Sequence, residues 1–286
     1  MKNQLFIGFI LLLFISSCGQ KGEEKIRIDD ETTGEGGYDE LGNQHGFWTF
    51  YYNDGTKQSE GYFKNGMQDG SWKFWYENGR LQEESIWVDG LAEGKFKSFH
   101  DNGKLASEGK YHRDFEEGKW KFYSEEGSLE SIGNYESGKA MGKYVWYYPS
   151  GQIEEIGYYN DTLLNGFSEG WYENGNKSFE GMYEDGERTG LWKWWYEGGQ
   201  LEETTEYQDD YLYGEDVTYY ENGNISYRGM FDYDDKVGIH IWYYDNGNKQ
   251  TESQYEDGLL NGKSIHYKKN GTIDFVESYA NGELIE

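Results

Sequence analysis

A strict 24-residue period constrains the fold of this chain more than any other feature. Glycine recurs every 24 residues at ten positions from Gly46 to Gly262 and at ten more from Gly55 to Gly271. Two aromatic columns keep the same period, one from Tyr51 to Tyr267 and one from Phe63 to Tyr279. Ten repeats without an insertion indicate a repeat protein, in which each unit packs against its neighbours along the chain.

Each 24-residue unit is predicted to be a β-hairpin. Between Gly70 and Glu93, strand-like segments flank Asn78-Gly79, a dipeptide that favours a two-residue type I′ turn. Asp89-Gly90 is predicted to turn the chain into the next unit, because both residue types tolerate a left-handed backbone. The expected fold class is therefore all-β, an elongated single-layer antiparallel meander of about ten β-hairpin repeats with about twenty strands.

This turn also sets an expected strand register. A two-residue turn would place Tyr76 opposite Leu81, with an aromatic ring lying across from a strand glycine in most units. Side chains alternate between the two faces of a strand. One face should therefore be aromatic, and the other should carry opposed charges, as at Lys73 and Glu84, together with a second aromatic column.

Charge and composition exclude some classes of partner. The 286 residues include 54 Asp and Glu against 26 Lys and Arg, a formal net charge of −28, which repels nucleic acid and anionic headgroups. Aromatic residues make up 19% of the chain, which is far from the composition of a disordered segment. A single cysteine rules out an intrachain disulfide bond.

The N-terminus has the features of an export signal. Lys2 is followed by an apolar stretch from Leu5 to Ile15, which is too short to span a membrane as a helix. Ile15-Ser16-Ser17-Cys18 resembles a bacterial lipobox, which implies cleavage after residue 17 and lipidation of Cys18. An ordinary secretory peptide is the alternative, but the only cysteine stands at the one position that the lipobox requires.

These observations give an expected organisation of the whole chain. Residues 1–17 are predicted to be the lipoprotein signal peptide, 18–34 the lipidated N-terminus with a flexible tether, 35–45 a half-repeat cap, and 46–286 the hairpin array. The half-repeat places Gly37 in the column of strand glycines. By resemblance to lipoprotein sorting, Gly19 after the cysteine favours the outer membrane of the cell envelope, with the leaflet left open.

The repeat unit itself resembles a known family. The pattern G-x-W-x-F-Y-Y-x-N-G-x-L-x-x-E-G-x-Y-x-x-G occurs with small departures in Gly70–Gly90 and Gly118–Gly138 and is similar to the MORN repeat variant. The resemblance covers Gly46 to Glu286. It implies a sheet of antiparallel hairpins with a role in protein or membrane-surface contacts and no enzyme activity. Some relatives are antitoxin components of toxin–antitoxin pairs.

The array departs from this pattern at a few polar positions. Ser168, Gly170, Asp216 and Thr218 replace aromatic residues. In the last repeat the aromatic-face positions are Ser264, His266 and Lys268, as expected for a unit that meets solvent. We interpret these departures as single polar or small residues without the converging groups of a catalytic pocket.

The sequence contains no recognisable motif for catalysis or metal binding. His240 and His266 come from adjacent repeats and could share a face, but a dedicated metal site needs more ligands. The acidic residues form solvated columns with no singular pair, and no nucleophile motif or phosphate loop is present. The sequence therefore predicts no catalytic residue, no metal and no cofactor.

The aromatic face is the predicted binding site. We expect a non-enzymatic binding or scaffold lipoprotein that docks a protein or a glycan at the cell envelope and touches the membrane through its lipid anchor only. The alternatives are an antitoxin or immunity-like protein of a toxin pair and a glycan-active enzyme. The ligand, the oligomeric state and a mere packing role for the rings stay open. The candidate face consists of Trp72, Phe74, Tyr76, Trp120, Phe122, Tyr144, Trp146, Tyr148, Trp192, Trp194 and Tyr196.

Overall fold

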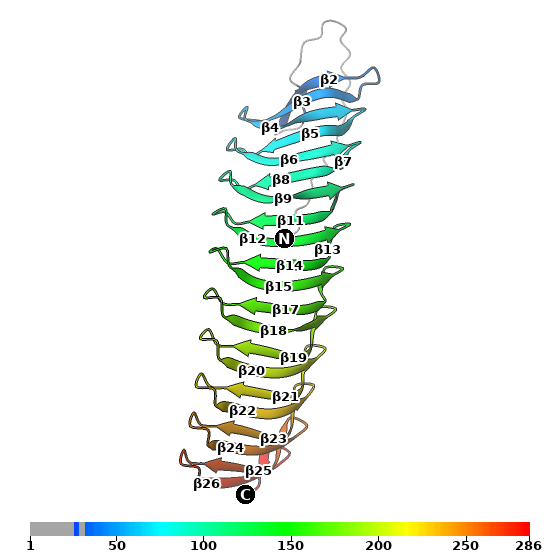
Figure 1. Cartoon of the computed structure of the whole chain (residues 1–286). Helices are drawn as coiled ribbons and strands as arrows, with labels where there is room; N and C mark the ends of the chain where they lie inside the picture. The colour runs from blue at the N-terminus through cyan, green and yellow to red at the C-terminus, as the bar shows by residue number, and fades with distance from the viewer. Residues whose placement is uncertain (1–25, 29–31) are drawn as a thin grey trace. The chain divides into compact units, whose positions relative to one another are not determined.

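The computed structural model describes residues 26–28 and 32–286, which form 27 strands and no helix (Figure 1). This part of the chain accordingly contains no helix that is long and apolar enough to cross a membrane. It divides into two compact units: unit 1 extends to Glu117 and includes Glu125–Gly127, and unit 2 comprises Gly118–Ser124 and Ser128–Glu286. Each unit is an antiparallel meander, which confirms the predicted all-β hairpin fold.

Within each unit the hairpins follow one another in chain order, and each long strand pairs with the long strands before and after it (Figure 1). Unit 1 contains β1 (Ile26–Arg27), β2 (Thr32–Tyr38), β3 (Gln44–Tyr52), β4 (Lys57–Lys64), β5 (Met67–Trp75), β6 (Leu81–Val88), β7 (Leu91–Ala92), β8 (Gly94–Phe99), β9 (Leu105–His112) and β10 (Phe115–Glu116). Unit 2 contains β11 (Gly118–Tyr123), β12 (Leu129–Glu136), β13 (Lys139–Ala140), β14 (Gly142–Tyr147), β15 (Ile153–Asn160), β16 (Leu163–Leu164), β17 (Gly166–Trp171), β18 (Lys177–Glu184), β19 (Glu187–Trp195), β20 (Leu201–Gln208), β21 (Tyr211–Tyr219), β22 (Ile225–Asp232), β23 (Asp235–Tyr243), β24 (Lys249–Glu256), β25 (Leu259–Tyr267), β26 (Ile273–Ala280) and β27 (Glu283–Leu284).

The Asn-Gly turn is longer than the sequence predicts. In the hairpin β5–β6, the Tyr76 amide donates to the Arg80 carbonyl at 2.9 Å, so the loop holds three residues. Gly79 has a φ of 78°, whereas Asn78 is not among the residues with positive φ. A type I′ turn requires positive φ at both residues. The turn is instead a type I turn followed by a left-handed glycine, and the type I′ prediction is wrong.

The extra loop residue shifts the register beside the turn. Trp75, not Tyr76, lies opposite Leu81, with a bulge between Phe74 and Trp75, so the predicted Tyr76–Leu81 pair is wrong. Beyond the bulge the predicted register is confirmed. The pairs there are Phe74 with Glu83, Lys73 with Glu84, Trp72 with Ser85 and Gly70 with Trp87.

The asparagine of the turn has another role, which is to join successive hairpins. Asn78 Nδ2 donates to the Asp101 carbonyl oxygen of the next turn at 3.0 Å. The same bond recurs from Asn222 to Asp245 at 2.8 Å. The type I′ geometry is found at the opposite end of the hairpin, where Asp89 and Gly90 have φ values of 47° and 83°.

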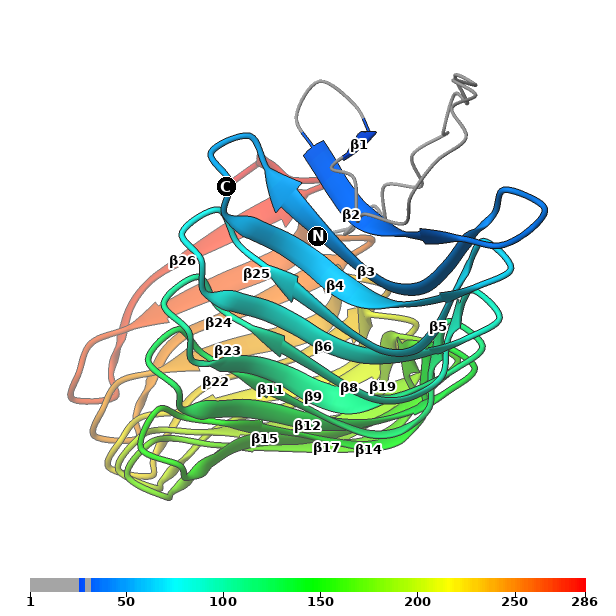
Figure 2. The same cartoon turned by 90° about the horizontal axis from the view of Figure 1, so that it is seen from above.

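The first strand of each repeat bends at the glycine column that runs from Gly46 to Gly262. Figure 2 shows the curvature of the strands from above. Glu93 N donates to the Ile86 carbonyl at 2.7 Å, and the adjacent Gly94 has a φ of 86°. This is a β-bulge, which inserts an unpaired residue and bends the strand. In four repeats the bulge separates a two-residue strand, β7, β10, β13 or β16, from the rest. The strand count therefore exceeds the predicted twenty.

At the N-terminal end, β2 pairs with β3, one residue out of the register that the glycine column predicts. Trp48 lies against Gly36, where an added Cβ would come within 2.2 Å of the indole ring, and not against Gly37. Ile26–Arg27 and Thr32–Gly34, which the sequence places in the tether, belong to β1 and β2. The predicted signal peptide and the Cys18 lipidation site lie outside the described residues.

Candidate binding face

The aromatic face is the side of the sheet that carries the Trp72 column, and its deepest rings pack onto strand glycines. A Cβ added to Gly61 would lie 2.3 Å from Trp72 Cδ2, so the indole rests directly on the backbone of the neighbouring strand. Trp72 is 2% exposed, and its Nε1 donates to the Tyr62 carbonyl at 3.0 Å. These rings are structural, because burial on a glycine leaves them no free surface for a ligand.

The same arrangement occurs in unit 2. A Cβ added to Gly181 would lie 2.1 Å from the Trp192 ring, and Trp192 Nε1 donates to the Met182 carbonyl at 3.2 Å. Phe179 and Trp194 lie on either side of Trp192 with centroids at 6.0 and 5.7 Å and interplanar angles of 18° and 25°. A stack of nearly parallel rings thus covers this part of the sheet.

The eleven predicted face residues fall into three groups. Trp72, Trp120 and Trp192 are buried. The hydroxyls of Tyr76, Tyr148 and Tyr196 donate to carbonyl oxygens of the following hairpins at 2.7 to 2.8 Å. Phe74, Phe122, Tyr144, Trp146 and Trp194 are half-buried and keep part of their rings accessible. The last group is the one able to touch a ligand.

Three of these accessible rings lie directly across from a carboxylate: Phe74 opposite Glu83 in unit 1, and two indoles in unit 2. Trp146 of β14 is opposite Glu155 of β15, and Trp194 of β19 is opposite Glu203 of β20. Burial raises the pKa of Glu155, although a hydrogen bond from Ser168 Oγ at 3.1 Å works against that shift. The two pairs of an indole and a carboxylate in unit 2 are four strands apart, about 19 Å at the usual strand spacing.

A polar cluster follows next to the second pair. Thr205 lies opposite Asp216, and its Oγ1 is 2.8 Å from Asp216 Oδ1 and 2.7 Å from Glu203 Oε1. Asp216 is 8% exposed. Its pKa is raised to about 6, mainly by burial and also by the nearby Glu203 charge, while the Thr205 hydrogen bond opposes the shift. The cluster places two carboxyl groups around one buried hydroxyl.

His240 continues the cluster on the next hairpin and is fully buried. Its Nε2 donates to the Met230 carbonyl at 2.9 Å, so Nδ1 accepts from the Tyr227 hydroxyl at 2.6 Å. Burial lowers the pKa of His240, and the Lys236 charge lowers it further. Lys236 Nζ itself lies 5.1 Å from the centroid of the Trp242 ring. Both imidazole nitrogens are engaged, which leaves His240 no lone pair for a metal.

No metal site is found in the part of the chain that the structure describes. Residues 26–28 and 32–286 contain no group of three or more His, Cys, Asp and Glu side chains that could hold an ion. His266 lies on the same face as His240, with Nε2 at 3.1 Å from Ser264 Oγ and at 3.3 Å from Glu277 Oε2. It therefore contacts hydroxyl and carboxylate partners in its own hairpin.

The convergence of these polar groups is what the sequence interpretation missed. The sequence predicts isolated polar residues where the aromatic pattern is interrupted, whereas the structure brings Glu203, Thr205 and Asp216 into contact. The 24-residue period contains the signal for this cluster, since positions 205 and 216 belong to columns that face each other in every repeat.

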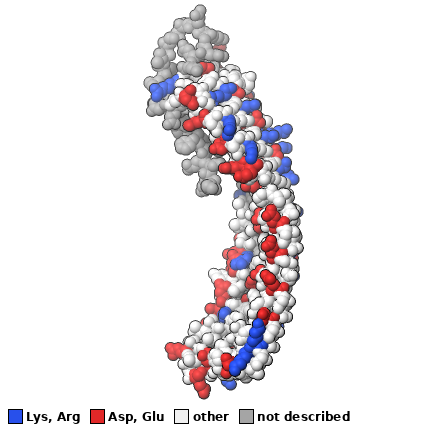
Figure 3. All heavy atoms as spheres, turned by 90° about the vertical axis from the view of Figure 1, so that its left-hand side faces the viewer, with Lys and Arg blue, Asp and Glu red and all other residues white. Residues whose placement is uncertain are grey.

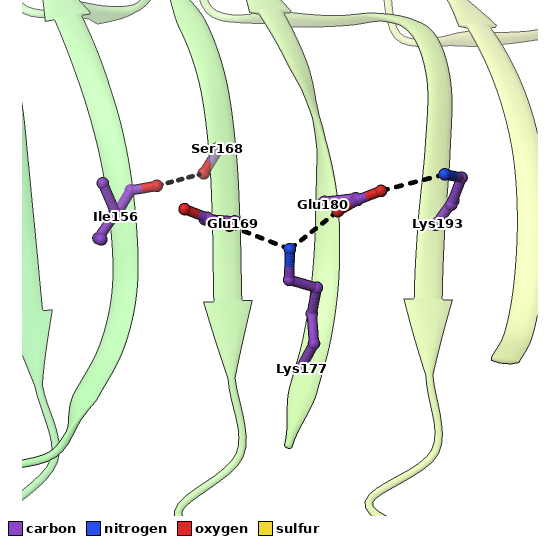
Figure 4. Close-up of polar contacts among 6 residues, drawn as sticks. All are labelled: Ile156, Ser168, Glu169, Lys177, Glu180 and Lys193. Atoms are coloured by element: carbon purple, nitrogen blue, oxygen red, sulfur yellow. Dashed lines mark hydrogen bonds and ion pairs between the residues drawn. The ribbon is translucent and has the colours of Figure 1, made fainter. Parts of the chain in front are cut away.

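The opposite side, the charged face, carries the predicted charge pairs. In unit 1, Lys73 Nζ lies 3.2 Å from Glu84 Oε1. In unit 2, Figure 4 shows Lys177 between two acids, with Nζ at 3.0 Å from Glu169 and 2.9 Å from Glu180, which also pairs with Lys193 at 3.1 Å. Such exposed pairs contribute about 0.2 to 1 kcal/mol each and do not distinguish a binding site.

Charge on the edge that carries the Asn-Gly turns differs along the chain. Figure 3 shows basic and acidic side chains interspersed over unit 1, whereas acidic side chains follow one another over the middle of unit 2. An acidic edge of this kind disfavours anionic ligands near unit 2 by simple repulsion.

The fold and the face together define a repeat protein of stacked β-hairpins. The profile of the MORN repeat variant family matches seven stretches, at residues 44–65, 68–89, 92–113, 116–137, 142–161, 188–209 and 236–257, which together make up more than half of the chain. The chain belongs to the MORN repeat variant family, as the sequence pattern predicted. The unmatched intervals contain Ser168, Asp216 and Ser264, so the face is polar where the chain departs from the family pattern.

Other comparisons add little. A search of curated proteins gave no match. Among solved structures, the chain is similar to the Tc holotoxin pore of Photorhabdus luminescens at 12% identity and a TM-score of 0.20, covering 88% of this chain and 17% of that one. A TcdB2-TccC3-Cdc42 structure is similar at 10% identity and a TM-score of 0.18, covering 87% and 16%.

Proposed function

We propose that this protein is a non-enzymatic binding lipoprotein of the bacterial cell envelope that holds a neutral glycan chain on the aromatic face of unit 2. The observation that carries the proposal is the recurrence of a half-buried indole directly opposite a carboxylate, at Trp146 with Glu155 and at Trp194 with Glu203. A flat ring stacks on the apolar face of a sugar, and a carboxylate accepts hydrogen bonds from sugar hydroxyls.

Rigidity supports a binding role for these rings. Trp194 is stacked on the buried Trp192 at 5.7 Å, so its orientation is fixed before a ligand arrives. Trp146 packs against Tyr144 at 4.5 Å and Tyr159 at 6.1 Å. Little side-chain freedom is lost on binding, which preserves affinity. The spacing of about 19 Å suits a ligand that extends across several strands.

A neutral ligand is favoured over an acidic one because the face and the chain are both acidic. Glu155, Glu203 and Asp216 lie near the accessible rings, and the chain carries a net charge of −28. Anionic polysaccharides and nucleic acids would be repelled. Catalysis is not part of the proposal, since the carboxyl and imidazole groups of the cluster are engaged with Thr205 and Tyr227.

The binding proposal is tested with adjacent residues on opposite faces. In the full-length chain, Trp194→Ala should weaken retention on two different immobilised neutral polysaccharides by at least about tenfold, a loss of more than about 1 kcal/mol. Trp146→Ala should act in the same way. Trp195→Ala is the matched control, because Trp195 is half-buried on the charged face, where Lys177 Nζ lies 5.8 Å from its ring.

Two outcomes would overturn the glycan proposal. In the first, neither of the glycan probes is retained by the wild-type chain. In the second, Trp194→Ala and Trp195→Ala lower retention equally while both variants keep the β-sheet circular dichroism of the wild type. A third outcome would indicate a protein ligand on the same face. In that case the wild type retains no glycan but captures a protein from an envelope extract, and Trp194→Ala no longer captures it.

Envelope anchoring is proposed from the lipobox and has a separate test. Cys18→Ala should leave the precursor unlipidated and move the chain out of the detergent phase in Triton X-114 partitioning. Ser17→Thr is a neighbouring control that leaves the modified thiol in place. Equal partitioning of Cys18→Ala and the wild type would show that the lipobox interpretation is wrong.

A further inference from the structure

A row of exposed apolar side chains crosses the charged face of unit 2, beside the bulge glycines. On consecutive long strands it consists of Tyr158 of β15, Phe167 of β17, Met182 of β18 and Leu191 of β19, which are 40, 41, 42 and 50% exposed. Phe167 and Met182 lie directly opposite each other. A continuous apolar row of this kind on a strongly charged chain points to a contact with another macromolecule.

The row ends in a basic residue on one side and an acidic residue on the other. Lys143 of β14 lies opposite Tyr158, and Glu206 of β20 lies opposite Leu191. Both side chains are exposed. Among the described residues neither Lys143 nor Glu206 forms an ion pair. Lys177 and Lys193, in contrast, are paired with Glu169 and Glu180.

The six residues form a pattern that is complementary to itself. Three successive hairpins present Lys143 with Tyr158, Phe167 with Met182, and Leu191 with Glu206. A twofold axis that runs parallel to the strands over the middle hairpin reverses this order. It would bring Lys143 of one copy onto Glu206 of the other, Tyr158 onto Leu191, and Phe167 onto Met182.

We propose that unit 2 pairs face to face with a second copy of the chain about such an axis. Isologous twofold contacts are the commonest form of self-association, because one patch then serves both subunits. Apolar side chains fill the centre, and the two unpaired charges become two symmetrical ion pairs at the rim, where they set register more than affinity. The contact uses the charged face, so the aromatic face stays free and the proposal does not depend on the proposed function.

Glu169 and Glu180, which lie in the row next to the apolar side chains, do not oppose this contact. Glu169 and Glu180 would approach their counterparts across the axis, but each is neutralised within its own copy. Lys177 Nζ lies 3.0 Å from Glu169 and 2.9 Å from Glu180, and Lys193 adds a second partner for Glu180 (Figure 4). Of the six residues in the pattern only the two at the ends are charged, and these have opposite signs.

The experiment is sedimentation velocity of the full-length chain in a mild detergent, with the contribution of bound detergent subtracted. The wild type should associate reversibly to a dimer. Lys143→Glu and Glu206→Lys should each weaken dimerisation by about tenfold, because each places like charges together at the rim. The double variant Lys143→Glu/Glu206→Lys should restore it, since the swapped charges meet again across the axis.

Lys263→Glu is the matched control. Lys263 occupies the same column as Lys143, is exposed, and lies opposite Ser278 outside the apolar row, so its reversal should leave dimerisation unchanged. A monomeric wild type at high concentration would overturn the proposal. So would a double variant that associates as weakly as the single variants, because that result excludes the twofold pairing of residues 143 and 206.

Discussion

Two hairpins of unit 2 hold different residues in the same structural position. Trp192 and His240 are 48 residues apart, and each lies on a strand glycine, Gly181 or Gly229. Trp192 Nε1 donates to the Met182 carbonyl at 3.2 Å, and His240 Nε2 donates to the Met230 carbonyl of the equivalent strand at 2.9 Å. The imidazole thus keeps the hydrogen bond of the indole while replacing a large apolar ring with a titratable one.

The surroundings of the two rings show the condition for this exchange. Trp192 is stacked between Phe179 and Trp194, whereas His240 accepts a hydrogen bond from Tyr227. A buried polar group is expensive unless it is hydrogen-bonded. Within the described residues, every buried side-chain nitrogen and oxygen has a hydrogen-bond partner. The hairpin scaffold therefore accepts polar residues on the aromatic face wherever a cross-strand neighbour supplies the second partner.

The largest difference between the two hairpins should appear on truncation. Trp192→Ala should lower the free energy of unfolding by about 3 to 5 kcal/mol, because it removes a buried ring and leaves a cavity. His240→Ala should cost less, about 1 to 3 kcal/mol, mainly through the unpaired groups it leaves. Urea denaturation followed by circular dichroism measures both. Equal losses would show that the aromatic stack contributes no more than the polar cluster.

A smaller effect should separate two glycines of one column. Gly181→Ala should destabilise by about 1 to 3 kcal/mol, because the new Cβ would lie 2.1 Å from the Trp192 ring and must displace it. At Gly157 the nearest atoms are Leu164 Cδ2 at 3.1 Å and Trp146 Cζ3 at 3.4 Å, so Gly157→Ala should cost less than about 1 kcal/mol. Thermal unfolding gives both values, and a Gly157→Ala loss as large as that of Gly181→Ala would refute the packing argument.

Much of this fold was predictable because the period is strict. Alternation and turn residues gave the hairpins, the two faces and the pairs from Phe74–Glu83 to Gly70–Trp87. The turn type was not predictable from Asn78-Gly79 alone. The Asn78 side chain donates a hydrogen bond to the next hairpin. A turn preference derived from a dipeptide within one hairpin does not include such a contact between repeats.

The candidate site was predictable in part. The accessible rings of Trp146 and Trp194 belong to the aromatic face predicted from the alternation. The polar cluster was missed because its members are far apart in sequence and meet only through register, as Thr205 and Asp216 do. The sequence also could not tell buried from accessible rings in one column. Trp192 and Tyr144 both lie on a strand glycine, but Phe179 covers Trp192, whereas the smaller Ser131 holds the equivalent position beside Tyr144.

The smallest expected effect concerns pH and belongs to the polar hairpins alone. Burial raises the pKa of Asp216 to about 6, above its ordinary value of 3.8, so the folded state favours the protonated carboxyl. The stability from this group is fully present below about pH 4 and is lost as the pH rises through about 6. Asp216→Asn cannot ionise and keeps an oxygen as acceptor for Thr205 Oγ1.

Between pH 4 and pH 7 the wild type should therefore lose about 1 to 2 kcal/mol more stability than Asp216→Asn. Other groups that titrate in this range, including His240, are present in both chains and cancel in the difference. Urea unfolding at pH 4, 5, 6 and 7 measures the two curves. Parallel curves of stability against pH would mean that Asp216 titrates as an exposed carboxyl does. A variant that loses more stability than the wild type would show that the pKa of Asp216 is not raised. Convergence at high pH together with a wild-type advantage at low pH would place the proton on the buried carboxyl beside Thr205.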